Sequence, residues 1–315
     1  MIESARKRQL PGLARVRLTG LGLLLPSLIF TSSELSAATL ALEGPLVQGG
    51  LVQGRTDADA TVMFEGRPVR VSAGGVFLIG FDRNFPAKAT LSVISADGNK
   101  ETRTLNIKQR SYKTQRIDGL PPKMVTPSEK DLERIRAESA QIKRTRARDD
   151  ARTDFLGGFI WPAVGRISGV YGSQRVLNGE PRRPHYGVDV AVPTGTPVLA
   201  PADGIVSLAH PDMYFTGGTL IVDHGHGLVT SYFHLSRVLV KQDQPVRQGD
   251  VIAEVGATGR VTGAHLHWSL NLFDQPLDPQ LLMKSHLARN APTSSQITAS
   301  GTAPGTANTG GDESK

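Results

Sequence analysis

Four histidines and one aspartate have the types and the spacing of a metal-dependent hydrolytic site. His185 and Asp189 lie four residues apart in HYGVD, His234 lies in YFHL, and His265 and His267 form a His-x-His pair in HLHW. Side chains alternate between the two faces of a strand with a period of two residues. If both pairs lie on strands, the two members of each pair therefore point to the same face.

The ligand atoms of these residues are imidazole nitrogens and a carboxylate oxygen, which suit zinc. Two histidines and one carboxylate, with one coordination position left open, form the ligand set of a hydrolytic zinc site. His265 shares the face of His267 and is either a fourth ligand or a carrier of protons. His234 follows an apolar run and is expected to enter the site from a neighbouring strand.

A second His-x-His pair, His224 and His226, is a weaker candidate. It lies in DHGHG, which indicates a hairpin loop rather than a strand. The glycines on either side leave the imidazoles loosely oriented, whereas a metal ligand needs support from its neighbours. We therefore expect this pair to lie outside the metal site.

Composition excludes several classes of protein. The 315 residues are 39% hydrophobic and include 34 glycines, which fits a turn-rich β protein. Cysteine is absent, so neither a cysteine nucleophile nor thiolate ligation is available. The formal net charge is +7, but aromatic residues make up only 5% of the chain, so we expect no nucleic-acid partner.

The first 38 residues have the pattern of an export signal. A basic stretch precedes the short apolar run LTGLGLLLPSLIF, and small residues up to Ala38 offer a cleavage site. We predict a protein exported to the periplasm or cell envelope. An uncleaved signal would act as a membrane anchor, although the apolar run is short for that purpose.

The remainder divides into four segments of a mainly β protein. Glycine-punctuated β patterns predict a small sandwich-like module over residues 39–112. Residues 113–158 are expected to form a linker and a charged helix, with Thr126 as cap, Pro127 in the first turn and an end near Arg152. We predict a second β domain over 159–286 and a disordered tail over 287–315. The thin apolar stripe of the helix favours a solvated connector, with docking over the groove as the alternative.

The second β domain resembles the lysostaphin/LytM-type zinc metallopeptidases. The motifs that carry the resemblance are HYGVD, GTPVLAPADGIV, SYFHL and GATGRVTGAHLH, which together cover about 120 residues. The resemblance implies an antiparallel β fold with a narrow groove. It also implies one zinc ion per chain held by His185, Asp189 and His267, with His234 and His265 as the catalytic histidines.

The leading hypothesis is an exported zinc metalloendopeptidase that hydrolyses the peptide cross-links of peptidoglycan. The N-terminal module or the helix would then contact other cell-wall enzymes. One alternative is a non-catalytic regulator of the same fold that binds and activates a cell-wall amidase; another is a zinc peptidase acting on secreted proteins. The presence of all five site residues favours an enzyme.

Overall fold

The computed structural model describes residues 40–119, 125–285 and 287–289. The predicted export signal and all but three residues of the predicted tail lie outside this range, and both stay predictions. Within the described residues, no helix combines the length and the apolar character that a membrane span requires.

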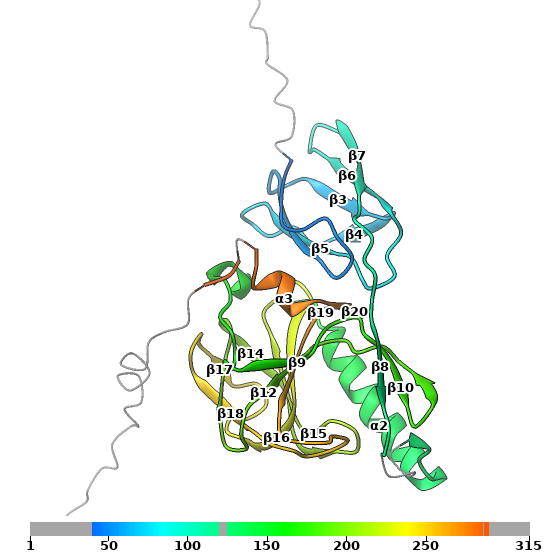
Figure 1. Cartoon of the computed structure of the whole chain (residues 1–315). Coiled ribbons are helices and arrows are strands. Elements are labelled where there is room, and N and C mark those ends of the chain that lie inside the picture. The colour runs from blue at the N-terminus through cyan, green and yellow to red at the C-terminus, as the bar shows by residue number, and fades with distance from the viewer. Residues whose placement is uncertain (1–39, 120–124, 286, 290–315) are drawn as a thin grey trace, which may run out of the picture. The chain divides into compact units, whose positions relative to one another are not determined.

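Residues 41–106 form two antiparallel sheets, drawn in blue and cyan in Figure 1. One sheet has the order β1-β2-β5 and the other β4-β3-β6-β7. Both contribute to one apolar cluster in which the ring of Phe64 packs against Phe81 and Phe85. The strands are β1 (Ala41–Glu43), β2 (Leu51–Arg55), β3 (Thr61–Phe64), β4 (Arg67–Val69), β5 (Val76–Gly80), β6 (Lys88–Ile94) and β7 (Lys100–Asn106).

The segment predicted as a linker contains a strand. Strand β8 (Thr114–Ile117) pairs in parallel with β10 (Gln174–Leu177), so this part of the chain is fixed to the second β domain by backbone hydrogen bonds. A linker prediction from glycine and proline content missed this pairing, because a single strand of four residues gains its stability only from the neighbour it meets in the fold.

The charged helix α2 spans Glu129–Arg146, and its predicted ends were wrong. Ser128, not Thr126, is the N-cap: its backbone is extended and its hydroxyl accepts a hydrogen bond from the Asp131 amide. The helix ends at Arg146, and the amide of the C-cap residue Ala147 donates to the carbonyls of Lys143 and Arg144 in the last turn.

Helix α2 is docked on the second β domain rather than surrounded by solvent. Ile142 packs against a small apolar cluster of that domain, and Arg134 pairs with Asp212. The carboxylate of Glu138 also accepts a hydrogen bond from the Tyr214 amide. Since no residue of the helix is fully buried, polar contacts carry much of this docking.

The second β domain is built on a ten-stranded sheet whose main path is β17-β14-β15-β16-β19-β12-β9. Three strands lie off this path: β18 pairs with β16 and with β13, and β20 pairs with β19. Strand β10 forms a separate small sheet with β8 and β11. This antiparallel architecture confirms the fold predicted for the domain (Figure 1). The elements are η1 (Asp154–Gly157), β9 (Arg166–Gly169), β11 (Glu180–Arg182), β12 (Val188–Ala191), β13 (Pro197–Leu199), β14 (Gly204–Met213), β15 (Gly217–Asp223), β16 (Leu228–Val238), β17 (Pro245–Val246), β18 (Val251–Val255), β19 (Leu266–Leu272), β20 (Gln275–Leu277) and α3 (Pro279–Leu282).

A third apolar cluster crosses the predicted domain boundaries. Phe155, which lies before the predicted start at Phe159, is fully buried against residues of the large sheet such as Leu270. Leu51 and Leu78 of the N-terminal module belong to the same cluster. The packing of the second domain therefore begins before residue 159.

Candidate metal centre

The structure brings His185, Asp189 and His267 together at one buried point. Asp189 on β12 and His267 on β19 face each other as direct partners in the antiparallel ladder. His185 lies before β12 rather than on it, so the expectation that it shares a strand with Asp189 was wrong. The loop nevertheless turns its imidazole onto the same carboxylate.

The ligand atoms converge closely. Oδ1 of Asp189 lies 3.0 Å from Nε2 of His185 and 2.8 Å from Nδ1 of His267. The two ring nitrogens are 3.0 Å apart. Nδ1 of His185 faces the carbonyl oxygen of Val170 at 3.0 Å and must donate to it, which leaves Nε2 with a lone pair aimed at the carboxylate. Two such acceptors repel each other unless a proton or a cation lies between them.

Burial and neighbouring groups set the charges of this cluster. Burial alone would raise the pKa of Asp189, but the close polar contacts with His185 and His267 outweigh it and hold that pKa well below its ordinary value. Burial lowers the pKa of His267 to about 4, against the opposing pull of Asp189. At neutral pH the site therefore presents an anionic carboxylate and an unprotonated His267, the forms that bind a metal.

These residues fit zinc. Zinc–ligand bonds of 2.0–2.2 Å in a tetrahedron place the ligand atoms about 3.3–3.6 Å apart. The separations found here, 2.8–3.0 Å, are smaller, and the three atoms lie close enough together to hold one ion.

Two glycines let the backbone approach the ligands. A side chain at Gly187 would place its Cβ 2.6 Å from the ring of His267, and one at Gly169 would place it 2.2 Å from Oδ2 of Asp189. Gly169 was not recognised in the sequence, because nothing in its local pattern distinguishes it from an ordinary strand glycine.

The two predicted catalytic histidines lie beside the metal ligands and beside each other. The rings of His234 and His265 are 4.9 Å apart between centroids, and Nε2 of His265 lies 3.7 Å from Oδ1 of Asp189. Each ring directs Nδ1 at a backbone carbonyl. Nδ1 of His234 lies 2.9 Å from the oxygen of Thr258, and Nδ1 of His265 lies 2.8 Å from that of Gly263. Nδ1 therefore donates in both rings, and Nε2 is left free to handle a proton.

His234 is held in an unusual conformation. It lies on β16 with φ of 65°, where the ladder with β15 and β18 shifts register. Such a backbone is costly for a residue other than glycine and often marks a functional position. Burial, with smaller contributions from His267 and His265, lowers the pKa of His234 to about 3, so the ring is neutral at neutral pH.

Sequence reasoning missed two side chains that hold the site. The guanidinium of Arg175 on β10 donates to Oδ2 of Asp189 at 3.3 Å, the oxygen that does not face the histidines. The ring of Phe233 stacks on His267 with 5.2 Å between centroids and 5° between planes. Phe233 adjoins His234 in the motif and could have been inferred from strand pairing, but Arg175 comes from a strand that carries no recognised motif.

His224 and His226 lie outside the metal cluster, as expected, in the turn between β15 and β16. The expectation that they are loosely oriented was wrong, because both are buried. Nδ1 of His224 bonds the carbonyl of Asp203 at 2.6 Å and Nε2 bonds the hydroxyl of Thr230 at 2.8 Å. These contacts give His224 a structural role.

The three predicted metal ligands lie where two cavities meet. One, of about 170 Å³, contains Asp189 and His265; the other, of about 500 Å³, contains His185 and His267. His234 lines both. Strand β8 contributes Gln115 and Ile117 to the smaller cavity, while helix α2 contributes Ile135, Ser139 and Arg146 to the larger.

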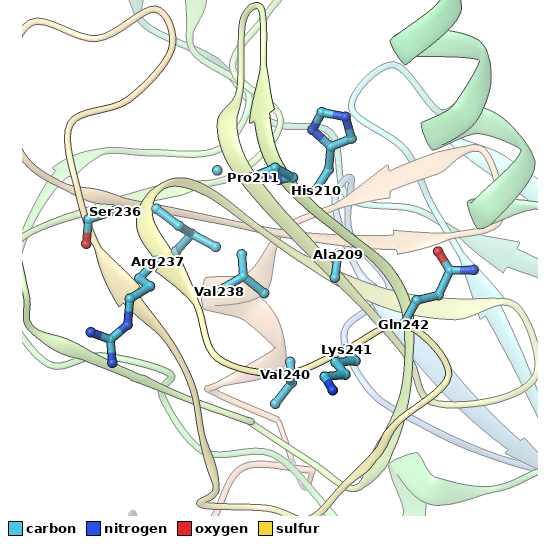
Figure 2. A pocket seen from close by; sticks show the side chains of 11 residues that line it. Ala209, His210, Pro211, Ser236, Arg237, Val238, Val240, Lys241 and Gln242 are labelled. Carbon is cyan, nitrogen blue, oxygen red and sulfur yellow. The ribbon is translucent and has the colours of Figure 1, made fainter.

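Another pocket of the same domain, of about 460 Å³, does not have the composition of a catalytic site (Figure 2). It is lined by residues of β14 and by the C-terminal part of β16, among them His210 and Arg237. His210 is its only histidine, and no carboxylate lines it. The residue types of a hydrolytic site therefore line the cavities around His267 and not this pocket.

Comparisons with known proteins agree with this geometry. The sequence profile of Peptidase family M23 matches residues 183–279, a segment that contains all five site residues. The Vibrio cholerae peptidoglycan DD-endopeptidase ShyA is 41% identical over 112 residues, which cover 32% of this chain and 25% of that protein. The cell division protein DipM of Caulobacter vibrioides is 36% identical over 133 residues, which cover 40% of this chain and 21% of that protein.

The matches to these curated relatives span a quarter or less of the relatives' own length. A crystal structure from Pseudomonas aeruginosa, described as a peptidase M23, is covered more fully. It is 30% identical with a TM-score of 0.55, and the alignment covers 75% of this chain and 94% of that one. Because the likeness extends over nearly the whole of that protein, the chain belongs to peptidase family M23.

Proposed function

We propose that this protein is a zinc metalloendopeptidase that hydrolyses the peptide cross-links of peptidoglycan. The observation that carries the proposal is the convergence of His185, Asp189 and His267 within about 3 Å of one another, in a groove that His234 and His265 also face. Relatives named as peptidoglycan endopeptidases support the substrate class.

His185, Asp189 and His267 would hold the zinc ion. When bound, zinc polarises a carbonyl and lowers the pKa of a water molecule toward 7. Arg175 keeps the second oxygen of Asp189 engaged, so that Oδ1 stays turned to the metal. The hydrogen bond from His185 to Val170 fixes the tautomer in which Nε2 is the ligand atom.

His234 and His265 move the protons. In both rings Nδ1 donates to a backbone carbonyl, which leaves Nε2 as the working atom. A neutral Nε2 accepts the proton of the attacking water and returns it to the leaving amine. While it holds that proton, the same ring donates a hydrogen bond from Nε2 to the developing oxyanion. Two histidines 4.9 Å apart between centroids serve both tasks on one bond.

The complete set of site residues favours hydrolysis over regulation. A regulator that only binds an amidase needs neither a ligand triad nor two further histidines with free Nε2 atoms. Export to the periplasm or cell envelope belongs to the same proposal and is supported by the pattern of residues 1–38. Mass-spectrometric determination of the mature N-terminus would test it, with a new terminus at residue 39 as the expected result.

The experiment is digestion of purified peptidoglycan sacculi, with the products identified by mass spectrometry. We expect loss of cross-linked muropeptides, inhibition by a chelator and recovery on adding zinc. His234→Ala is the matched inactive variant. If wild-type protein with full zinc leaves the sacculi intact but stimulates a purified amidase, the regulator takes the place of the enzyme. If it cleaves unfolded secreted proteins instead, the substrate class is wrong.

A further inference from the structure

The larger cavity beside the metal ligands has an unusual charge balance. Its lining includes five arginines, at positions 146, 175, 182, 183 and 260, and neither an aspartate nor a glutamate. Arg175 is paired with Asp189, and the side chain of Arg260 lies over the ring of Phe215. Among the described residues, Arg146, Arg182 and Arg183 have no carboxylate within ion-pair distance.

Arg146 is the most informative member of this group. It comes from the last turn of α2, and its Nη2 lies 3.3 Å from the hydroxyl of Ser231. Its Nε is buried without a hydrogen-bond partner. Burial, together with the nearby Arg183, lowers the pKa of Arg146 to about 10, and Asp274 offsets this only in part. A half-buried guanidinium whose Nε lacks a partner destabilises the free protein unless a ligand compensates it.

A role in capping the helix does not explain this position. Basic residues in the last turn stabilise a helix through its dipole, but Lys143 and Arg144 already do so and both are exposed. Arg146 alone among the basic residues of that turn points into the cavity.

Strand β19 provides polar groups beneath the guanidinium. His267, Ser269 and Asn271 alternate along the strand and share one face, and all three line the cavity. Ser269 is the ladder partner of Ser231, which Arg146 contacts. The hydroxyl of Ser269 is buried and has no hydrogen-bond partner, although its side chain is almost wholly enclosed.

We propose that Arg146 and Ser269 form a carboxylate-binding subsite that selects peptides bearing a free carboxylate near the scissile bond. The proposal rests on the proposed endopeptidase function and names the substrate feature that the groove recognises. A guanidinium with free N–H groups and a hydroxyl donor match the two oxygens of a carboxylate.

The geometry also sets the position of that carboxylate. Two residues along a strand span about 7 Å, so Ser269 lies about that far from the metal ligand His267. An extended peptide in the groove advances by about 3.4 Å per residue and so covers this distance in two residues. The recognised carboxylate therefore belongs to a residue about two positions from the scissile bond. Arg146 lies outside the segment matched by the family profile, so this selectivity is supplied by helix α2.

The test uses pairs of synthetic cross-linked stem peptides that differ only in having a carboxylate or its amide at that position. Binding is measured by calorimetry on the metal-free full chain, so the result does not depend on hydrolysis. We expect wild-type protein to bind the carboxylate form about 10- to 100-fold more tightly, the range for hydrogen bonds to a charged group. Arg146→Gln should abolish the preference without weakening binding of the amide, and Arg146→Lys should keep part of it.

The control is Arg144→Gln, which removes an exposed arginine of the same turn and should change nothing. Thermal unfolding of each variant identifies loss of fold, and Arg146→Lys keeps the test valid if Arg146→Gln is unstable. Equal binding of both peptides by wild type overturns the proposal, as does a preference that survives in Arg146→Gln. A protein that shows the preference yet cleaves no peptide supports the subsite and contradicts the proposed hydrolysis.

Discussion

Gly187→Ala should release the metal without unfolding the protein. The added Cβ would lie 2.6 Å from both Cε1 and Nε2 of His267 and 2.7 Å from the carbonyl oxygen of Trp268. Ordinary contact begins near 3.4 Å, so the imidazole must move by about 0.8 Å. The Trp268 oxygen belongs to β19 itself, so the ring cannot escape simply by changing rotamer.

The size of this shift decides the expected effect. Zinc sites tolerate deviations in ligand distance of about 0.2 Å. A movement of about 0.8 Å therefore removes His267 as a ligand or distorts the site severely. Loss of groups that merely orient a ligand costs about 10- to 100-fold in metal affinity. We expect displacement of the ligand itself to cost about 100-fold or more, with peptidase activity falling in proportion to zinc occupancy.

The assay is competition for zinc with a chromophoric chelator, with circular dichroism and thermal unfolding as measures of fold. Gly263→Ala is the matched control, because it adds the same methyl group near His265 where no atom lies within 4 Å. Zinc affinity of Gly187→Ala within a few-fold of wild type would refute the argument from close packing.

Three further predictions concern ligands, pH and packing. Alanine variants of the proposed catalytic histidines, His234 and His265, should retain zinc and lose about 100-fold or more in hydrolysis rate. Alanine variants of the proposed ligands should instead lose zinc: His185→Ala, Asp189→Ala and His267→Ala. Metal analysis distinguishes the two groups. Burial lowers the pKa of His224 from 6.5 to about 4, so the unfolded chain binds its proton first as pH falls and stability is lost between pH 6.5 and 4. At about 1.4 kcal/mol per pKa unit this loss is about 3.5 kcal/mol, and urea unfolding should show a weaker pH dependence in His224→Gln. A chain starting at Phe159 should be less stable than one starting at residue 150, because it lacks the buried Phe155. Loss of such a side chain costs about 3–5 kcal/mol in the free energy of unfolding. Equal melting temperatures would contradict this prediction.

The fold of the second domain was readable because its signals are local. Glycine, proline and aspartate punctuate short apolar strands, and the turn at His224 and His226 was located from its glycines alone. The burial of that turn could not be predicted, because it depends on a hydrogen bond to the carbonyl of Asp203, which lies 21 residues from His224. The ends of α2 were misplaced for a related reason: Thr126 and Ser128 are both competent caps, and only the conformation of the backbone selects Ser128.

The five candidate site residues could be selected from the sequence itself, since their chemical types and their motifs are carried by short runs such as HYGVD and HLHW. Only the tertiary structure decided which residues support them and which other residues line the same groove. Three supporting residues come from segments with no motif. Arg175 and Gly169 contact Asp189, and Arg146 contacts Ser231, so these contacts join residues 14 to 85 positions apart. Their placement follows from strand pairing and helix docking. Those depend on the packing of the whole chain, which no local pattern encodes.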